Sequence, residues 1–323
     1  MHANTGIGKE GVAMAIAVAF AMSLINYLLH PVEIVPVEYG VCLDSPDYWQ
    51  IPPLISWIIN TVLIGIITLS IYLINRHFNF VRTTEPALPI IFLIMSCSSA
   101  WFTQNLNTST LLCLVNVVSL GIVFGAYESN NATRQMFIMG GVLGIGSMFQ
   151  YAFLPMACVY VLWAICVKVL RIKEVLAFLI GILCPYWITG GLGWVKLCDF
   201  HFPSFVTLFT TTKDHSDIFF LLLGIGIATI LGVLTGLSNS MKLYAGNSQV
   251  NAMNLCITIM GLASIICILV DYENIPAYVL TLYLAVATQL ANLCALWHIR
   301  NEWTVTIIPV LIYIALFVCN LVL

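Results

Sequence analysis

Two carboxylates three residues apart, Asp44 and Asp47, are the first side chains in this sequence whose spacing suggests chemistry. One helical turn would place both on the same face, and Tyr48, Trp49 and Trp57 follow closely. Carboxylates beside aromatic rings at a membrane surface could bind a sugar or act as a general base in catalysis. The alternative is a solvated loop next to an interfacial belt of aromatic residues. Both interpretations stay open.

A second group of ionisable side chains lies in the loop 196–217. Its members are of types that ligate divalent metals. They are Asp199, His201, Asp214, His215 and Asp217. Because their spacing matches no tight metal motif, a polar amphipathic loop is the alternative to a site that binds substrate or a divalent metal. Asp271 and Glu273 form a third, smaller acidic group in a short loop.

The composition of the chain predicts that membrane-spanning helices connect these loops. Of 323 residues, 61% are hydrophobic and 8% are charged, and the mean hydropathy is +1.02. Soluble domains carry about 25% charged residues. Apolar runs near the length that crosses roughly 30 Å of hydrocarbon recur along the whole chain. They must be helices, because backbone groups in lipid have to pair within their own segment. A net charge of −3 without a basic block argues against nucleic-acid binding.

The fold class predicted is therefore all-α, a polytopic helical membrane protein of about eleven transmembrane helices in a single domain, residues 1–323. The expected spans are 11–30, 52–75, 87–104, 108–126, 136–151, 152–168, 175–195, 218–237, 252–270, 279–297 and 303–322.

Orientation follows from the distribution of Lys and Arg. With the N-terminus in the cytoplasm and the C-terminus outside, only Lys196 and Lys213 of the 11 Lys and Arg fall on the outer side. This agrees with the excess of basic residues in cytoplasmic loops. The expected location is a bacterial inner membrane, and the acidic loops then face outward.

One long apolar run, 136–168, has basic residues at both ends, so it must cross an even number of times. We expect a hairpin of two short helices that turns near Gln150, Tyr151 and Pro155. The run 87–127 has the same character and should turn at 105–108.

Polar and small side chains within the spans predict helix–helix packing. Six amides should be contacts between helices rather than transport sites. They are Asn26, Asn60, Asn116, Asn254, Gln289 and Asn292. Gly140 and Gly144, one turn apart, should let two backbones approach closely.

Two covalent features stay open. Most cysteines lie in apolar runs and are expected to act as buried hydrophobes, but Cys42 and Cys198 lie in loops on the same side and could pair. Cleavage after Ala21, before Met22, is the alternative to an uncleaved first helix.

The stretches 75–79, 144–151 with Pro155, 171–174 and 181–186 resemble uncharacterised multi-pass inner-membrane proteins of Bacteroidota. The layout is more distantly similar to polyprenol-dependent glycosyltransferases of the GT-C type. That resemblance implies an acidic residue in the first outer loop, for which Asp44 or Asp47 is the candidate. The sequence is short for that class, and we expect no periplasmic domain within residues 1–323.

Three functions are compatible with these residues. The favoured one is a non-catalytic subunit or scaffold of a membrane complex, with a membrane protein as partner. The alternative is a GT-C-like transferase acting on a lipid-linked (polyprenyl-phosphate) substrate at the outer leaflet. Asp44 or Asp47 would then be the base, and Asp199, His201 or His215 would assist or hold a metal. The third is a transporter of a neutral or lipid substrate. The sequence leaves enzyme and non-enzyme both open.

Overall fold

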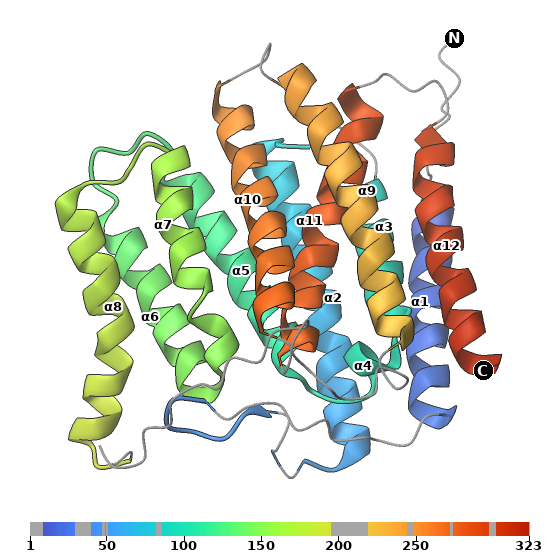
Figure 1. The fold of residues 1–323 in the computed structure, drawn as a ribbon, viewed down its shortest axis with the longest axis horizontal. Helices are drawn as coiled ribbons and strands as arrows, with labels where there is room; N and C mark the ends of the chain where they lie inside the picture. The colour runs from blue at the N-terminus through green and yellow to red at the C-terminus, as the bar shows by residue number, and fades with distance from the viewer. Residues whose placement is uncertain are drawn as a thin grey trace.

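The computed structural model describes residues 9–29, 40–46, 49, 51–81, 86–194, 219–243, 248–271, 274–296 and 302–322, which form helices and no strand. The helices lie side by side and alternate in direction (Figure 1). In chain order they are α1 (Lys9–Leu29), α2 (Pro53–Phe78), α3 (Ala87–Cys97), α4 (Ala100–Thr103), α5 (Thr108–Gly125), α6 (Thr133–Phe149), the short 3-10 helix η2 (Tyr151–Phe153), α7 (Met156–Cys166), α8 (Ile172–Gly191), α9 (Phe219–Leu243), α10 (Ser248–Val270), α11 (Ile275–Leu296) and α12 (Glu302–Val322).

This architecture confirms the prediction of a polytopic helical membrane protein. Apart from 87–104, each predicted span coincides with a helix, and seven described helices are long and apolar enough to cross a bilayer. The run 136–168 does turn at Gln150 and η2, between α6 and α7. The chain is therefore an integral membrane protein.

The predicted span 87–104 differs from the structure because the helix breaks after Cys97. Ser98 donates its hydroxyl to the carbonyl of Met95 (2.8 Å), and Ser99 is extended (φ −118°, ψ 136°) before α4 begins. With 11 residues, α3 is only about 16 Å long and cannot cross the hydrocarbon alone. Nearly all of its side chains are buried, so the irregular backbone that follows it is covered by protein rather than lipid.

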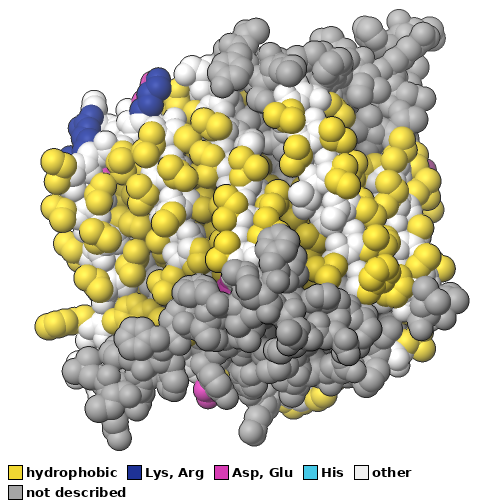
Figure 2. Space-filling model, viewed as in Figure 1, with side chains coloured by type: hydrophobic (Ala, Val, Ile, Leu, Met, Phe, Trp, Pro, Cys, Tyr) yellow, Lys and Arg dark blue, Asp and Glu magenta, His cyan; other side chains and the backbone are white. Residues whose placement is uncertain are grey.

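Charged side chains mark one end of the bundle. On the face in Figure 2, apolar side chains cover the helices, and Lys and Arg gather at the upper left, at the α7–α8 end of Figure 1. There Lys168 and Glu128 form an ion pair (2.7 Å) between the α5–α6 and α7–α8 turns. The hydrogen bond between them lowers the pKa of the Glu128 carboxyl and raises that of the Lys168 amine. This is the end that we expect to face the cytoplasm.

The amides within the spans join helices, as predicted. Asn26 donates to Thr103 (3.0 Å) and Asn116 to Thr281 (3.1 Å). Similar contacts involve the other four amides, Asn60, Asn254, Gln289 and Asn292.

Glycines bring α6 and α8 into backbone contact. A Cβ on Gly140 would lie 2.2 Å from the carbonyl oxygen of Phe178, and one on Gly144 would lie 2.5 Å from that of Ile182. Neither oxygen belongs to a flexible side chain that could move aside. The close backbone approach predicted for Gly140 and Gly144 is therefore confirmed, and both helices belong to the same chain.

We expect Gly140→Ala to lower the free energy of unfolding by about 1–3 kcal/mol, because the new methyl group forces the two backbones apart. Gly141→Ala is the matched control, since its Cβ would lie 3.8 Å from the nearest atom, the Gly181 oxygen. Thermal unfolding of both variants in detergent measures the difference. Equal unfolding midpoints for the two variants would show that α6 and α8 can move apart without loss of stability.

Candidate functional site

The loop that carries Asp44 is fixed against the C-terminal end of α6. Val41 and Leu43 donate their backbone N–H groups to the carbonyls of Ser147 (3.2 Å) and Met148 (2.9 Å). Gly40 passes so close that a Cβ there would lie 2.2 Å from the Met148 oxygen. A residue with any side chain would push the loop away, so glycine is needed for the loop to lie this close to the α6 backbone.

Asp44 itself is exposed, while its neighbour is not. Ser45 is fully buried, and its hydroxyl lies 3.1 Å from that of Thr108, the first residue of α5. Asp44 makes no ion pair or hydrogen bond with another described residue. The anchored loop therefore presents this carboxylate to solvent at the acidic end of the bundle.

Two further features adjoin this loop. The ring of Trp49 meets that of Phe149 edge-on, with centroids 5.7 Å apart. Partial burial raises the pKa of the Cys42 thiol, which keeps it protonated and weakly nucleophilic near neutral pH.

A buried carboxylate lies at the same end of the bundle. Asp271 follows the last residue of α10 and is 5% exposed. Asn274 donates its amide to both carboxylate oxygens (2.9 and 3.0 Å), and Tyr278 donates its hydroxyl to one of them (3.0 Å). Because an uncompensated buried carboxylate is costly, these donors are what allow Asp271 to sit inside the protein.

Gln150 joins this cluster to the turn after α6. It is fully buried, and its amide nitrogen donates to the Asn274 side-chain oxygen at 2.5 Å. A continuous set of contacts thus runs from the Asp44 loop through the end of α6 and Gln150 to Asn274 and Asp271. We call the side chains Gln150, Asp271, Asn274 and Tyr278 the outer polar cluster.

Sequence reasoning placed Asp271 in an outer loop but did not connect it to Gln150. One local signal was present, since Asp271, Asn274 and Tyr278 are spaced three and four residues apart, as on one face of a helix. The contact with Gln150, 124 residues away, has no such signal.

The other predicted site residues cannot be placed beside Asp44. Asp47 lies outside the described residues, and so do Asp199, His201, Asp214, His215 and Asp217. Cys198 lies outside them as well, so its pairing with Cys42 stays a prediction. In the described part of the chain, no three His, Cys, Asp or Glu side chains come together as a metal site would require.

Comparison with known proteins gives a likeness of fold. No protein-family model matches the sequence, and no curated protein matches it. The structure is similar to the oligosaccharyltransferase of Archaeoglobus fulgidus, which was crystallised tethered through a disulfide bond to an acceptor peptide containing the NVT sequon. The TM-score is 0.52 at 9% sequence identity, and the likeness covers 96% of this chain and 54% of that one. The chain thus spans about half the length of the protein that it resembles. The likeness to the oligosaccharyltransferase does not support the resemblance to Bacteroidota proteins.

Proposed function

We propose that this protein is a membrane-embedded transferase of the GT-C type that uses a lipid-linked, polyprenyl-phosphate donor at the outer leaflet. The observation that carries the proposal is the likeness to an oligosaccharyltransferase along nearly the whole chain. A second observation supports it independently. The first loop at the acidic end is anchored by backbone hydrogen bonds, and it presents an exposed carboxylate at Asp44.

In the proposed reaction, the nucleophile of an acceptor bonds to the carbon of the transferred group that is attached to the donor phosphate. The bond from that carbon to the phosphate oxygen breaks, and its electron pair leaves with the polyprenyl phosphate. Asp44 accepts the proton that the acceptor loses. A positioned carboxylate in this role accelerates a reaction by about 10²–10⁴-fold.

A divalent metal would offset the charge that develops on the leaving phosphate. In the described part of the chain, no three His, Cys, Asp or Glu side chains come together to hold such an ion. The assignment of substrate or metal binding to Asp199, His201, Asp214, His215 and Asp217 stays a prediction, as does that of a second catalytic carboxylate to Asp47.

The outer polar cluster gives the proposed base a rigid support. The end of α6 that binds the Asp44 loop continues directly into Gln150, which is held by Asn274. Preorganised supports of this kind matter because small displacements of a catalytic group lower its effect strongly.

Native mass spectrometry of the full chain, released gently from its own membrane, tests the proposal. We expect a bound polyprenyl-phosphate species, and we expect its occupancy to rise in Asp44→Asn because the donor is bound but not consumed. Glu10→Gln is the matched control, since Glu10 is also exposed but lies in the first turn of α1, at the opposite end. Equal occupancy in all three proteins would contradict the role of Asp44.

A non-catalytic subunit is the second candidate function. It is favoured by the extent of the likeness, because 46% of the oligosaccharyltransferase chain (100% less the 54% covered) has no counterpart here. If activity required that part, another polypeptide would have to supply it. A second polypeptide in the native spectrum, without any polyprenyl-phosphate species, would establish this alternative.

A further inference from the structure

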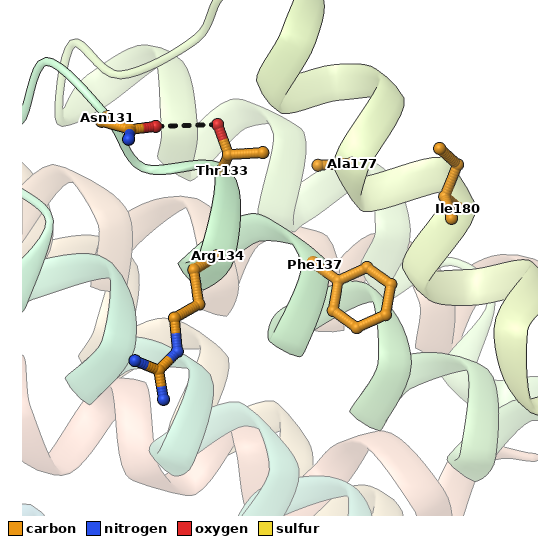
Figure 3. Close-up of a pocket in the computed structure, with 6 residues that line it drawn as sticks. All are labelled: Asn131, Thr133, Arg134, Phe137, Ala177 and Ile180. Atoms are coloured by element: carbon orange, nitrogen blue, oxygen red, sulfur yellow. Dashed lines mark hydrogen bonds between the residues drawn. The ribbon is translucent and has the colours of Figure 1, made fainter.

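A cavity opens between α6 and α8 at the basic end of the bundle, the end opposite the outer polar cluster (Figure 3). Its volume is about 480 Å³. The residues that line it are Asn131, Thr133, Arg134, Phe137, Ala177 and Ile180. Figure 3 shows Arg134 and Phe137 projecting from α6, and Ala177 and Ile180 from α8.

Arg134 is the positively charged residue that lines this cavity, and it has no ion pair or side-chain hydrogen bond among the described residues. The neighbouring basic side chains do have partners. These pairs are Lys168 with Glu128 (2.7 Å), Arg171 with Asn130 (3.0 Å) and Lys173 with Glu174 (3.5 Å). Glu174 is buried in the first turn of α8, where its carboxylate lies 3.5 Å from both the Lys173 amine and the Thr133 hydroxyl, and it does not pair with Arg134. The guanidinium of Arg134 is thus left without a described counter-charge.

The N-terminus of α6 adds to this positive charge. Both α6 and α8 begin at this end, at Thr133 and Ile172, and neither has a side-chain cap. Glu174 in the first turn of α8 offsets the positive end of that helix dipole, whereas α6 has no acidic residue in its first turn, and its first N–H groups lack intrahelical acceptors. A cation in the first turn, such as Arg134, is unfavourable at a helix N-terminus unless an anion accompanies it.

Beyond Asn131, Thr133 and Arg134, the lining of the cavity is apolar. Phe137 lies one turn deeper than Arg134 along α6, and Ile180 lies two turns into α8. Along the outer face of α8, Leu176 and Leu183 are exposed as well. A basic group above an open apolar groove matches the two parts of an anionic phospholipid.

We propose that this cavity binds an anionic membrane phospholipid, with its phosphate on Arg134 and the uncapped end of α6, and an acyl chain along Phe137 and Ile180. Arginine suits this role because its planar donors match phosphate oxygens. Basic pockets between helices on the cytoplasmic side are suited to anionic head groups. The inference does not depend on the proposed transferase activity, since the two sites lie at opposite ends of the bundle.

The test uses the full-length protein in detergent, with phosphatidylglycerol added in defined amounts and bound lipid counted by native mass spectrometry. We expect phosphatidylglycerol to bind more tightly than phosphatidylcholine. Arg134→Gln should weaken phosphatidylglycerol binding about fivefold, as expected for one basic side chain near a lipid surface. The matched control is Arg76→Gln, an exposed arginine in the last turn of α2, which should change binding little.

Three results would overturn the proposal. They are equal phosphatidylglycerol binding by Arg134→Gln and the wild type, equal binding of the two lipids by the wild type, and equal losses for Arg134→Gln and Arg76→Gln. Inorganic phosphate is the remaining probe. If phosphate alone raised the unfolding midpoint as much as the lipid does, and Arg134→Gln removed that effect, the site would be for a free anion and the lipid proposal would fail.

Discussion

Asp44→Asn should lower the rate of group transfer by about 100-fold or more, because asparagine keeps the shape of the side chain but cannot accept the acceptor's proton. The thermal unfolding midpoint should stay unchanged, since the side chain is exposed and makes no hydrogen bond or ion pair with another described residue. The measurement is the transfer of label from a polyprenyl-phosphate extract of the native membrane to acceptor, with the purified protein in liposomes.

Asp44→Glu is the informative companion variant. It keeps the base but moves it by one methylene, so partial activity is expected. Full activity of Asp44→Asn would remove this residue from the mechanism and would leave Asp47 as the candidate base. Loss of activity together with a lowered unfolding midpoint would mean that the residue supports the loop rather than the reaction.

Asp271→Ala should lower the free energy of unfolding by about 3 kcal/mol. The substitution leaves the Asn274 amide and the Tyr278 hydroxyl inside the protein without the acceptor that they now share. Each buried donor left unsatisfied costs about 1–3 kcal/mol. Unfolding in detergent, followed by tryptophan fluorescence, measures the loss.

Asp44→Ala is the control for this variant, because it removes an exposed carboxylate from the same end and should change stability by less than about 0.5 kcal/mol. The double variant Asp271→Ala, Gln150→Ala tests the connection across the bundle. If the outer polar cluster acts as one unit, the two losses should be less than additive. Strict additivity would mean that Gln150 and Asp271 act separately.

Much of the fold could be predicted from the sequence because the bilayer imposes a simple rule on length and polarity. The hairpin 136–168 shows this well. Its total length and the basic residues at both ends required a turn, and the structure has one at Gln150. The break between α3 and α4 was missed, because an apolar run does not reveal whether its neighbours will shield a short helix from lipid.

The candidate site was predictable only in part. The exposed position of Asp44 follows from its place in an outer loop, but the anchoring of that loop on Met148 depends on contacts between distant segments. The burial of Asp271 has the same origin. A polar residue just after an apolar run is ordinarily assigned to solvent. Asp271 is buried because Tyr278 hydrogen-bonds to it and Gln150 packs onto its partner Asn274.

The most enclosed of the seven long spans has a consequence for how the chain is made. The apolar window in α11 has the lowest mean hydropathy of the seven, 1.3, and 94% of it is buried. Its Thr281 and Gln289 contact α5 and α10 rather than lipid. During synthesis this segment leaves the translocon with polar groups that lipid cannot satisfy. It therefore depends on helices inserted earlier, and a chain in which α5 or α10 is misplaced would present α11 to membrane quality control as an unassembled segment.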